Sequence, residues 1–259
     1  MILDEICEHK RVEVEAAKAR APLAELEDRI ERVRAPRDFR QALREPGISL
    51  IAEIKRASPS KGVLLEDMDP VQLASLYESA GARAISVLTD EKYFRGSLGD
   101  LSIVSQQANL PCLRKEFVVD PYQIHEARAA GADALLLIVR VLSDKELESF
   151  LQITHALGMK ALVETHNEEE IARALGAGAH IIGINNRNLA NFSENVDLTL
   201  DLRKHVPGGN VLVSESGIRS RDHVRRLDDG GIDAVLIGEA LVTSQNIAGK
   251  IRELLNDAG

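Results

Sequence analysis

The chain repeats one short pattern four times: a glycine that ends a helix-like segment, followed by a run of apolar residues. The glycines are Gly81, Gly131, Gly178 and Gly231, and successive ones lie 47 to 53 residues apart. This spacing is roughly twice the length of one strand plus one helix, so each interval has room for a second strand. The repeat therefore predicts a fold in which strands and helices alternate throughout.

Eight apolar runs of strand length fit this alternation. Four follow the glycines, within residues 80–88, 130–138, 178–184 and 230–237, and the other four cover residues 49–55, 110–117, 159–164 and 211–215. The segments between the runs carry helix-start signals, either an N-cap residue before proline or a capping box or close analogue. These signals are Asp69-Pro70, Asp120-Pro121, Ser143-x-x-Glu146 and Asn167-x-x-Glu170.

Eight alternating units favour a closed parallel barrel of the (β/α)8, or TIM-barrel, type. An open, doubly wound sheet is the structural alternative, but no Gly-x-Gly-x-x-Gly follows the first strand and nothing indicates a reversal of strand order. The length of 259 residues suits one such barrel. We expect one domain over residues 1–259, with a helical extension over residues 1–44 and the barrel over residues 45–259.

The charge balance argues against several classes of partner. Lys and Arg number 32 against 41 Asp and Glu, and no short block is rich in basic residues, which disfavours nucleic-acid binding. The apolar runs are too short to span a membrane, and the N-terminus begins with acidic residues rather than a signal segment. We expect a cytoplasmic protein that binds neither nucleic acid nor membrane, and a monomer, with a homodimer as the alternative.

The cysteines and histidines predict no metal centre. Cys7 and Cys112 have the spacing of neither a disulfide framework nor a zinc site. The 7 histidines are dispersed along the chain. We therefore expect no bound metal.

Polar and charged side chains stand at the carboxyl ends of five predicted strands. Glu53 and Lys55 point the same way at the end of the first strand, because alternate residues of a strand share a face. The third, fifth, sixth and seventh strands end in Lys115, Glu164, Asn185 and Glu215-Ser216. Any one of them alone is equally explained as a rim charge beside a paired neighbour. Together they predict a catalytic cluster of mixed sign at the end of the barrel where such enzymes keep their chemistry.

The loops around this cluster suggest a binding pocket. The turns Ser216-Gly217-Ile218 and Gly238-Glu239-Ala240 lead into helices and suit a phosphate group, although ordinary β-to-α turns have the same composition. The segment Ser58-Pro59-Ser60-Lys61-Gly62 is either a lid or a solvated loop. An apolar side of the pocket is expected from Phe94, Phe117, Leu136 and Leu189, with core packing as the alternative.

From about residue 38 to the C-terminus, the chain resembles the indole-3-glycerol phosphate synthase family. The motifs that carry the resemblance are residues 51–62 (IAEIKRASPSKG), 88–90 (LTD), 93–97 (YFRGS), 113–117 (LRKEF), 182–189 (IGINNRNL) and 213–218 (VSESGI). The resemblance implies closure of 1-(2-carboxyphenylamino)-1-deoxyribulose 5-phosphate to indole-3-glycerol phosphate, with loss of carbon dioxide and water. It implies no cofactor and no metal, and it places the N-terminal extension over the active-site end.

Residue roles follow from the resemblance by position. Lys115 resembles the general acid that protonates the ketose oxygen. Glu164 resembles the acid/base group of the later proton transfers, and Lys55 the cation that holds the carboxylate and assists dehydration. The division of acid roles between the two lysines stays open.

The remaining matched positions are expected to orient these groups and to bind the substrate. Glu53 should orient the lysines, Asn185 should position the polar chain of the substrate, and Glu215 should contact the sugar hydroxyls. The phosphate grip corresponds to Ser58, Ser216, Gly217 and Gly238, the ring wall to Phe94, Phe117, Leu136 and Leu189, and further substrate contacts are expected at Lys61, Arg187 and Glu239.

Two other functions compete with this interpretation. A related barrel, phosphoribosylanthranilate isomerase, needs a carboxylate and a cysteine-type acid/base pair at strand ends, and neither Cys7 nor Cys112 occupies such a position. A non-catalytic barrel that only binds phosphorylated ligands would not need the charged strand ends, all of which are present here.

Overall fold

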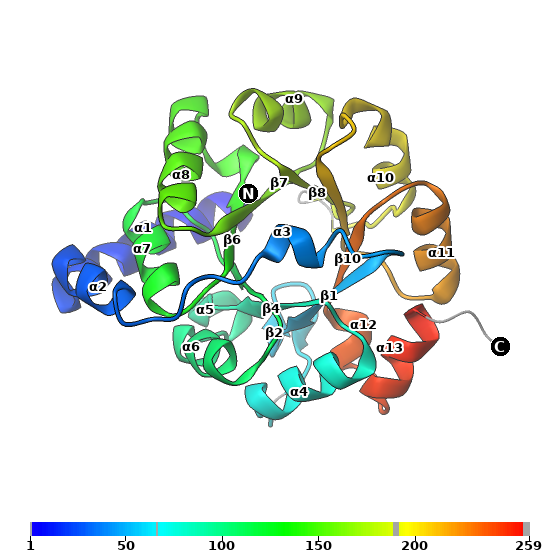
Figure 1. The fold of residues 1–259 in the computed structure, drawn as a ribbon, viewed down its shortest axis with the longest axis horizontal. Helices are drawn as coiled ribbons and strands as arrows, with labels where there is room; N and C mark the ends of the chain where they lie inside the picture. The colour runs from blue at the N-terminus through cyan, green and yellow to red at the C-terminus, as the bar shows by residue number, and fades with distance from the viewer. Residues whose placement is uncertain (1, 66, 189–191, 256–259) are drawn as a thin grey trace.

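The computed structural model describes residues 2–65, 67–188 and 192–255. Its eight parallel strands close into a barrel in the order β1-β10-β9-β8-β7-β6-β5-β4 (Figure 1). The barrel strands are β1 (Ser49–Ile54), β4 (Ala84–Leu88), β5 (Cys112–Lys115), β6 (Ala134–Ile138), β7 (Lys160–Thr165), β8 (Ile181–Asn185), β9 (Val211–Glu215) and β10 (Ala234–Ile237). The predicted barrel is confirmed, and each strand lies within or next to its predicted run.

Helices surround the barrel and connect its strands. They are α4 (Pro70–Ala80), α5 (Glu91–Phe94), α6 (Leu98–Gln107), α7 (Tyr122–Ala129), α8 (Asp144–Ala156), α9 (Glu168–Gly176), α10 (Asp197–Leu202), α11 (Arg221–Asp229), α12 (Glu239–Val242) and α13 (Ile247–Leu255), with the 3-10 turns η1 (Val139–Val141) and η2 (Arg203–His205). A small antiparallel hairpin, β2 (Ala57–Ser58) with β3 (Gly62–Val63), follows β1. No helix among the described residues is long and apolar enough to cross a membrane.

The four repeated glycines end their helices by turning the chain back towards the barrel. Gly81, Gly131, Gly178 and Gly231 have φ of 109°, 90°, 87° and 73°, a backbone region that side chains with a β-carbon rarely adopt. Each glycine therefore marks the point where a helix stops and the chain enters the next strand. Alternate side chains of each strand face the barrel interior and the surrounding helices, and both sets are buried. The strands are therefore nearly continuous apolar runs in the sequence.

The predicted helix starts are confirmed at three of four places. Asp69 caps α4 ahead of Pro70, Ser143 and Glu146 form a capping box on α8, and the Asn167 side chain accepts a hydrogen bond from the Glu170 amide. The fourth helix starts one residue later than expected, at Tyr122 rather than Pro121. The Asp120 carboxylate still accepts a hydrogen bond from the Tyr122 amide, so it retains the capping role.

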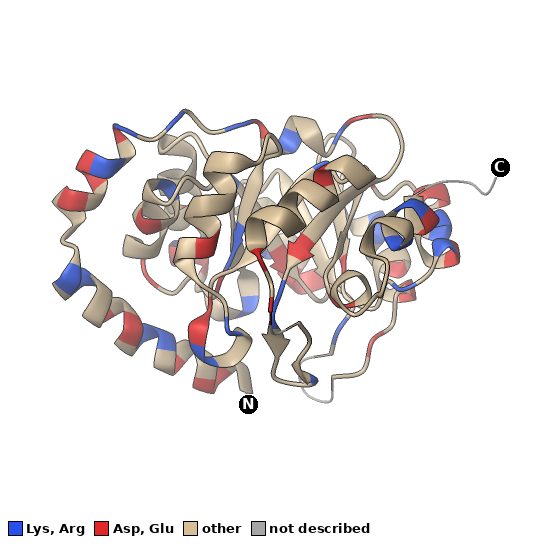
Figure 2. Ribbon diagram, turned by 90° about the horizontal axis from the view of Figure 1, so that it is seen from below, with Lys and Arg blue, Asp and Glu red and all other residues tan. Residues whose placement is uncertain are grey.

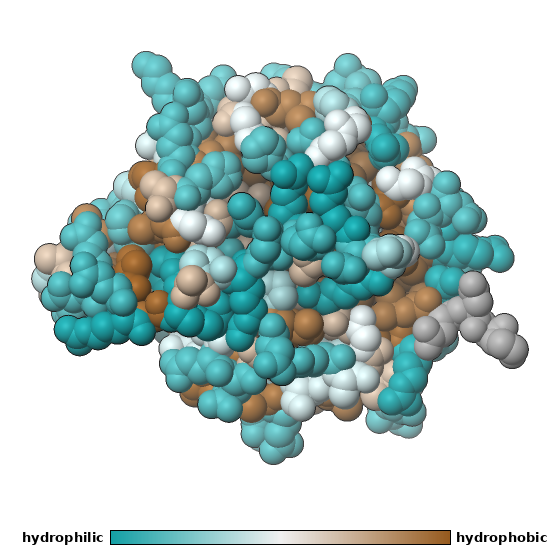
Figure 3. Space-filling view, viewed as in Figure 1, coloured by the Kyte–Doolittle hydropathy of each residue, from teal (hydrophilic) through white to brown (hydrophobic). Residues whose placement is uncertain are grey.

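The N-terminal extension covers both ends of the barrel. It contains α1 (Ile2–Arg20), α2 (Leu23–Ile30) and α3 (Phe39–Ala42). Phe39 and Leu43 are fully buried in the barrel interior beside Ala84, Ala134 and Ala234, the first residues of their strands. Short α3 therefore closes the end at which the strands begin, the end facing the viewer in Figure 1. Hydrophilic side chains cover the centre of this face (Figure 3).

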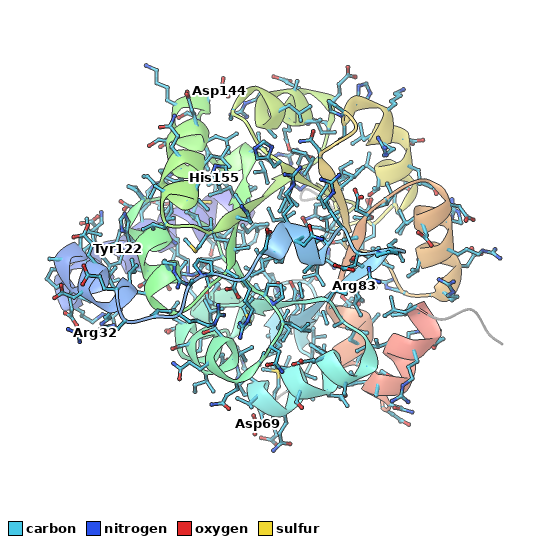
Figure 4. The ribbon with its side chains drawn as sticks, viewed as in Figure 1. Arg32, Asp69, Arg83, Tyr122, Asp144 and His155 are labelled. Carbon is cyan, nitrogen blue, oxygen red and sulfur yellow. The ribbon has the colours of Figure 1, made fainter. Side chains whose placement is uncertain are left out.

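Helix α1 lies at the opposite end, where the strands finish. Figure 2 shows charged residues of both signs along it. Ile2, Leu3 and Ile6 at its start face the pocket described below. The C-terminal end of α1 is fixed by Tyr122 of α7, labelled in Figure 4. The Tyr122 hydroxyl donates to the carbonyls of Ala17 and Ala21. The family resemblance implied that the N-terminal extension covers only the active-site end of the barrel. In the structure the extension reaches both ends of the barrel.

Candidate active site

One pocket opens at the carboxyl ends of the barrel strands, the end at which enzymes of this barrel type bind their substrates. Most of the predicted site residues line it. They are Glu53, Lys55, Ser58, Phe94, Lys115, Phe117, Asn185, Arg187, Glu215, Ser216, Gly217, Gly238 and Glu239. The sheet thus collects residues that are up to 186 positions apart in the chain, because parallel strands all end at one rim.

Lys115 occupies the floor of the pocket between two carboxylates. Its Nζ lies 3.6 Å from Glu164 Oε2 and 3.6 Å from Glu215 Oε2. Burial alone would lower the pKa of Lys115, but the negative charges of Glu164, Glu215 and Glu53 outweigh it and raise the pKa. The side chain keeps 17% exposure, so a charged ammonium faces the pocket. This is the arrangement required of a proton donor that must stay charged until it reacts.

The two carboxylates beside Lys115 are almost completely buried. Glu164 is 3% exposed and lies behind Lys115 rather than on the pocket wall, and Glu215 is 1% exposed. Burial raises the pKa of Glu215 by more than Lys115 lowers it. Gly183 on β8 leaves room for the Glu215 side chain, because a β-carbon there would overlap Glu215 Oε1. Lys115 and Glu215 therefore both have raised pKa values in one buried cluster.

A second pair stands on β1. Lys55 Nζ lies 3.6 Å from Glu53 Oε2 and 5.6 Å from the centre of the Phe94 ring. A cation above a ring face is attracted to it, so Lys55 is directed toward the aromatic side of the pocket. Asn185, which is 8% exposed, accepts a hydrogen bond of 3.0 Å from the Arg187 amide through Oδ1. These contacts hold the polar side chains in place around one cavity.

The apolar side of the pocket is a pair of phenylalanines. The ring centres of Phe94 and Phe117 lie 5.9 Å apart at an interplanar angle of 35°. Ile2, Leu3 and Ile6 of α1 also line the pocket. Two predicted wall residues are not part of this group. Leu136 lies in the barrel interior, 2% exposed and away from the pocket lining, and Leu189 lies outside the described residues.

The turns after β9 and β10 and the hairpin after β1 surround the remaining side. Ser216 and Gly217 both have positive φ, 67° and 76°, which bends the chain sharply at the end of β9. Ser58 Oγ is buried without a hydrogen-bond partner in the described structure, and Ser58 lines the pocket. A buried hydroxyl without a partner favours a polar ligand there. Lys61 lies exposed on the hairpin, away from the pocket lining.

Sequence reasoning missed an ion-pair cluster at the rim. Glu194 Oε1 lies 2.5 Å from Arg187 Nη2, and Glu194 Oε2 lies 2.7 Å from Arg219 Nη2. Arg187 also donates a hydrogen bond of 2.9 Å to Ser60 Oγ, which joins this cluster to the hairpin after β1. Glu194 and Arg219 lie in irregular loops, where no periodicity of the sequence indicates which side chains face inward. No group of three or more potential metal ligands occurs within the described ranges.

Comparisons with known proteins agree with the resemblance. A family model described as indole-3-glycerol phosphate synthase matches residues 3–254. The indole-3-glycerol phosphate synthase of Roseiflexus sp. (strain RS-1) is 52% identical over 262 residues, covering 98% of this chain and 97% of the relative. That of Mycolicibacterium gilvum (strain PYR-GCK) is 50% identical over 254 residues, covering 98% and 93%.

The similarity to solved structures concerns the fold alone. The crystal structure of 3-hexulose-6-phosphate synthase from Salmonella typhimurium has a TM-score of 0.66 at 15% sequence identity. The match covers 80% of this chain and 96% of that protein. At such low identity the likeness shows a shared barrel and says nothing of the reaction.

Proposed function

The chain belongs to the indole-3-glycerol phosphate synthase family, and we propose that the pocket at the carboxyl ends of its strands carries out that family's reaction. The enzyme is a carboxy-lyase of tryptophan biosynthesis. It closes 1-(2-carboxyphenylamino)-1-deoxyribulose 5-phosphate to indole-3-glycerol phosphate and releases carbon dioxide and water. The observation that carries the assignment of the site is the Lys115 ammonium, held 3.6 Å from two buried carboxylates at the floor of the pocket.

Ring closure needs a proton at the ketose oxygen while the aromatic carbon bearing the carboxylate attacks the ketose carbon. Lys115 supplies this proton, because Glu164 and Glu215 keep its amine charged and its tip faces the pocket. General acids of this kind contribute about 10²- to 10⁴-fold in rate. Loss of carbon dioxide from the aromatic carbon that made the attack then restores the aromatic ring.

Dehydration removes hydroxide from the former ketose carbon and a proton from the neighbouring methylene group. Glu164 accepts that proton, and Lys55 holds the carboxylate before it leaves and assists the departure of the hydroxyl. Lys55 suits this role because it lies beside Phe94, which together with Phe117 would contact the anthranilate ring. Glu53 holds Lys55, and Glu215 and Asn185 would bind the polar chain of the substrate.

The phosphate would bind where the turns after β9 and β10 meet the hairpin. Ser58, Ser216, Gly217 and Gly238 line this part of the pocket, and Arg187 and Glu239 stand beside it. Short α12 begins at Glu239, directly after β10, which is the position of the phosphate site in many barrels of this kind. We further propose that Lys61 contacts the substrate when the hairpin closes, and that the enzyme is a cytoplasmic monomer.

The cysteines do not support the competing isomerase chemistry. Cys112 begins β5, at the opposite end of that strand from Lys115. Burial and then the Asp133 charge raise the pKa of Cys112 to about 12, and burial raises the pKa of Cys7. A thiol with a raised pKa is a poor acid/base group near neutral pH.

The direct test follows indole fluorescence when the purified protein, treated with EDTA, is incubated with the carboxyphenylamino substrate. Wild type and a variant with exposed Lys204→Ala should form product at similar rates, while Lys115→Ala should lose about 10²- to 10⁴-fold in kcat. A folded wild-type protein that forms no indole product would refute the proposed function.

A further inference from the structure

The imidazole of His166 stands between two carboxylates at the end of β7. Its Nδ1 lies 3.1 Å from Glu170 Oε2, and its Nε2 lies 3.6 Å from Glu164 Oε1. The His166 side chain is 6% exposed, and those of Glu164 and Glu170 are 4% and 9% exposed. Glu164 is the group to which the proposed function gives the proton transfers of dehydration. A titratable ring is therefore buried directly behind it.

Glu170, on the Nδ1 side of the imidazole, is held in its ionised form. Arg140 Nε and Nη2 donate to Glu170 Oε1 at 3.0 and 2.9 Å, and the His166 amide donates to Oε2 at 2.8 Å. Burial alone would raise the pKa of Glu170, but the hydrogen bonds and charges of His166 and Arg140 outweigh it and lower the pKa to about 2. A permanent carboxylate beside Nδ1 keeps a proton on that nitrogen.

The other ring nitrogen has no such partner. Nε2 is buried and makes no hydrogen bond in the described structure. The nearest acidic atom is Glu164 Oε1, while the other oxygen of Glu164 faces Lys115 Nζ at 3.6 Å. With a proton on Nδ1, Nε2 has a lone pair that can accept a proton from Glu164, and once protonated it can donate to the Glu164 carboxylate.

We propose that His166 is a positioning residue that holds Glu164 in place and shares one proton with it during the reaction. The exchange is Glu164-COOH with neutral His166, in equilibrium with Glu164-COO⁻ and His166 imidazolium. It moves one proton between Oε1 and Nε2 and requires no other reactant. The proton that Glu164 takes from the methylene group passes to Nε2, and Glu164 is restored as a base. The role rests on the proposed function, because it acts only through Glu164.

A purely structural role would give a different outcome. Glu170 also accepts from Asn167 at the start of α9, so His166 could serve only to complete that helix start. In that case its replacement would change stability but not the pH dependence of kcat. The groups that face the imidazole and set this dependence are Glu164 of β7 and Glu170 of α9, with Arg140 of η1 behind Glu170.

The test replaces His166 by glutamine, whose amide still donates a hydrogen bond to Glu170 but cannot exchange a proton with Glu164. We expect kcat to fall about 10- to 100-fold, KM to stay within about twofold, and the kcat–pH profile to lose one of its inflections. His155→Gln, on the exposed end of α8 labelled in Figure 4, is the matched control and should behave as wild type.

The outcomes separate the two proposals. An active wild type whose kcat and pH profile are unchanged in His166→Gln would overturn this role and leave the proposed function standing. An inactive, folded wild type would overturn the proposed function and this role with it. Should His166→Gln not fold, Glu170→Gln takes its place. Glu170→Gln should lower kcat by a smaller factor than His166→Gln and change the same inflection of the kcat–pH profile. Wild-type kinetics in Glu170→Gln would equally overturn the role.

Discussion

The Lys10 ammonium on α1 lies 2.8 Å from Asp90 Oδ2, a carboxylate with no exposed side-chain surface. Burial alone would lower the pKa of Lys10, but the charges of Glu116, 3.2 Å away, and Asp90 outweigh it and raise the pKa. Asp90 caps the helix that carries Phe94, and Glu116 accepts from the amide of Phe117. One buried lysine therefore connects the N-terminal helix to both rings of the pocket wall.

Replacing Lys10 by methionine should destabilise the protein strongly. It removes the cation 2.8 Å from the buried Asp90 carboxylate and leaves Glu116 only Arg114, at 3.7 Å, so we expect a loss of about 3–5 kcal/mol in the free energy of unfolding. The KM for the substrate should rise as well, because Asp90 and Glu116, whose carboxylates accept backbone hydrogen bonds beside Phe94 and Phe117, lose the cation that holds them in place. Urea unfolding and steady-state kinetics measure the two effects.

Lys18→Met on the same helix is the matched control. Lys18 pairs with Glu15 and Asp120, but its side chain is 36% exposed. Exposed ion pairs contribute little, so we expect a change below about 1 kcal/mol and an unchanged KM. If Lys10→Met and Lys18→Met lowered the free energy of unfolding equally, burial of the Lys10 ion pairs would not explain the loss.

Asp133 holds the extension at the other end of the barrel, and Asp133→Asn should reduce stability without reducing activity. Its buried carboxylate accepts from the Arg34 guanidinium at 2.6 and 2.9 Å, from the Arg37 amide at 2.7 Å and from the Cys112 amide at 2.8 Å. We expect a loss of about 2–4 kcal/mol in urea unfolding, with kcat within about twofold of wild type. Asp144→Asn, in an exposed pair, should be nearly neutral.

The sequence was sufficient to predict the barrel because its signals are local and repeated. Gly81, Gly131, Gly178 and Gly231 each stop a helix through a positive φ, and that requirement can be recognised one position at a time. The strand-end residues could be predicted for a related reason: in a parallel barrel every strand ends at the same rim, so the end of a strand already determines the place of Lys115 or Glu215.

Contacts made across irregular segments could not be predicted in this way. Lys10 lies on a helix whose apolar spacing is irregular, and nothing local indicates that its side chain is buried against Asp90. Glu194 and Arg219 lie in loops without periodicity. His166 follows Glu164 by two residues, yet its position between carboxylates depends on where α9 places Glu170. Such pairings arise from tertiary packing, which a single sequence does not specify position by position.

Glu215→Gln should stabilise the protein at high pH and not at low pH. The folded-state pKa of Glu215 is raised, chiefly by burial, so the folded state binds more protons than the unfolded state between the usual carboxyl pKa and the raised one. Wild-type stability from this group is therefore present at low pH and is lost as pH rises through that window.

An amide does not ionise, so the variant should gain about 1 kcal/mol or more relative to wild type between about pH 5 and pH 8 in urea unfolding. A constant difference across this range would contradict the raised pKa.

Gly238→Ala should impair the reaction with little effect on the fold. The backbone at Gly238 has a negative φ of −121°, so alanine meets no left-handed penalty there and the expected effect comes from space. A β-carbon there would overlap Glu53 Oε2 and lie 3.1 Å from Glu53 Cβ, which forces the whole Glu53 side chain away from Lys55. Displacement of a catalytic group by about 1 Å can cost 10²-fold, so we expect kcat/KM to fall about 10- to 100-fold. Gly176→Ala should leave kcat/KM unchanged, because in the described part of the chain no atom beyond its own helix turn lies within 4 Å of the added β-carbon. Equal activity in the two variants would show that Glu53 does not position Lys55.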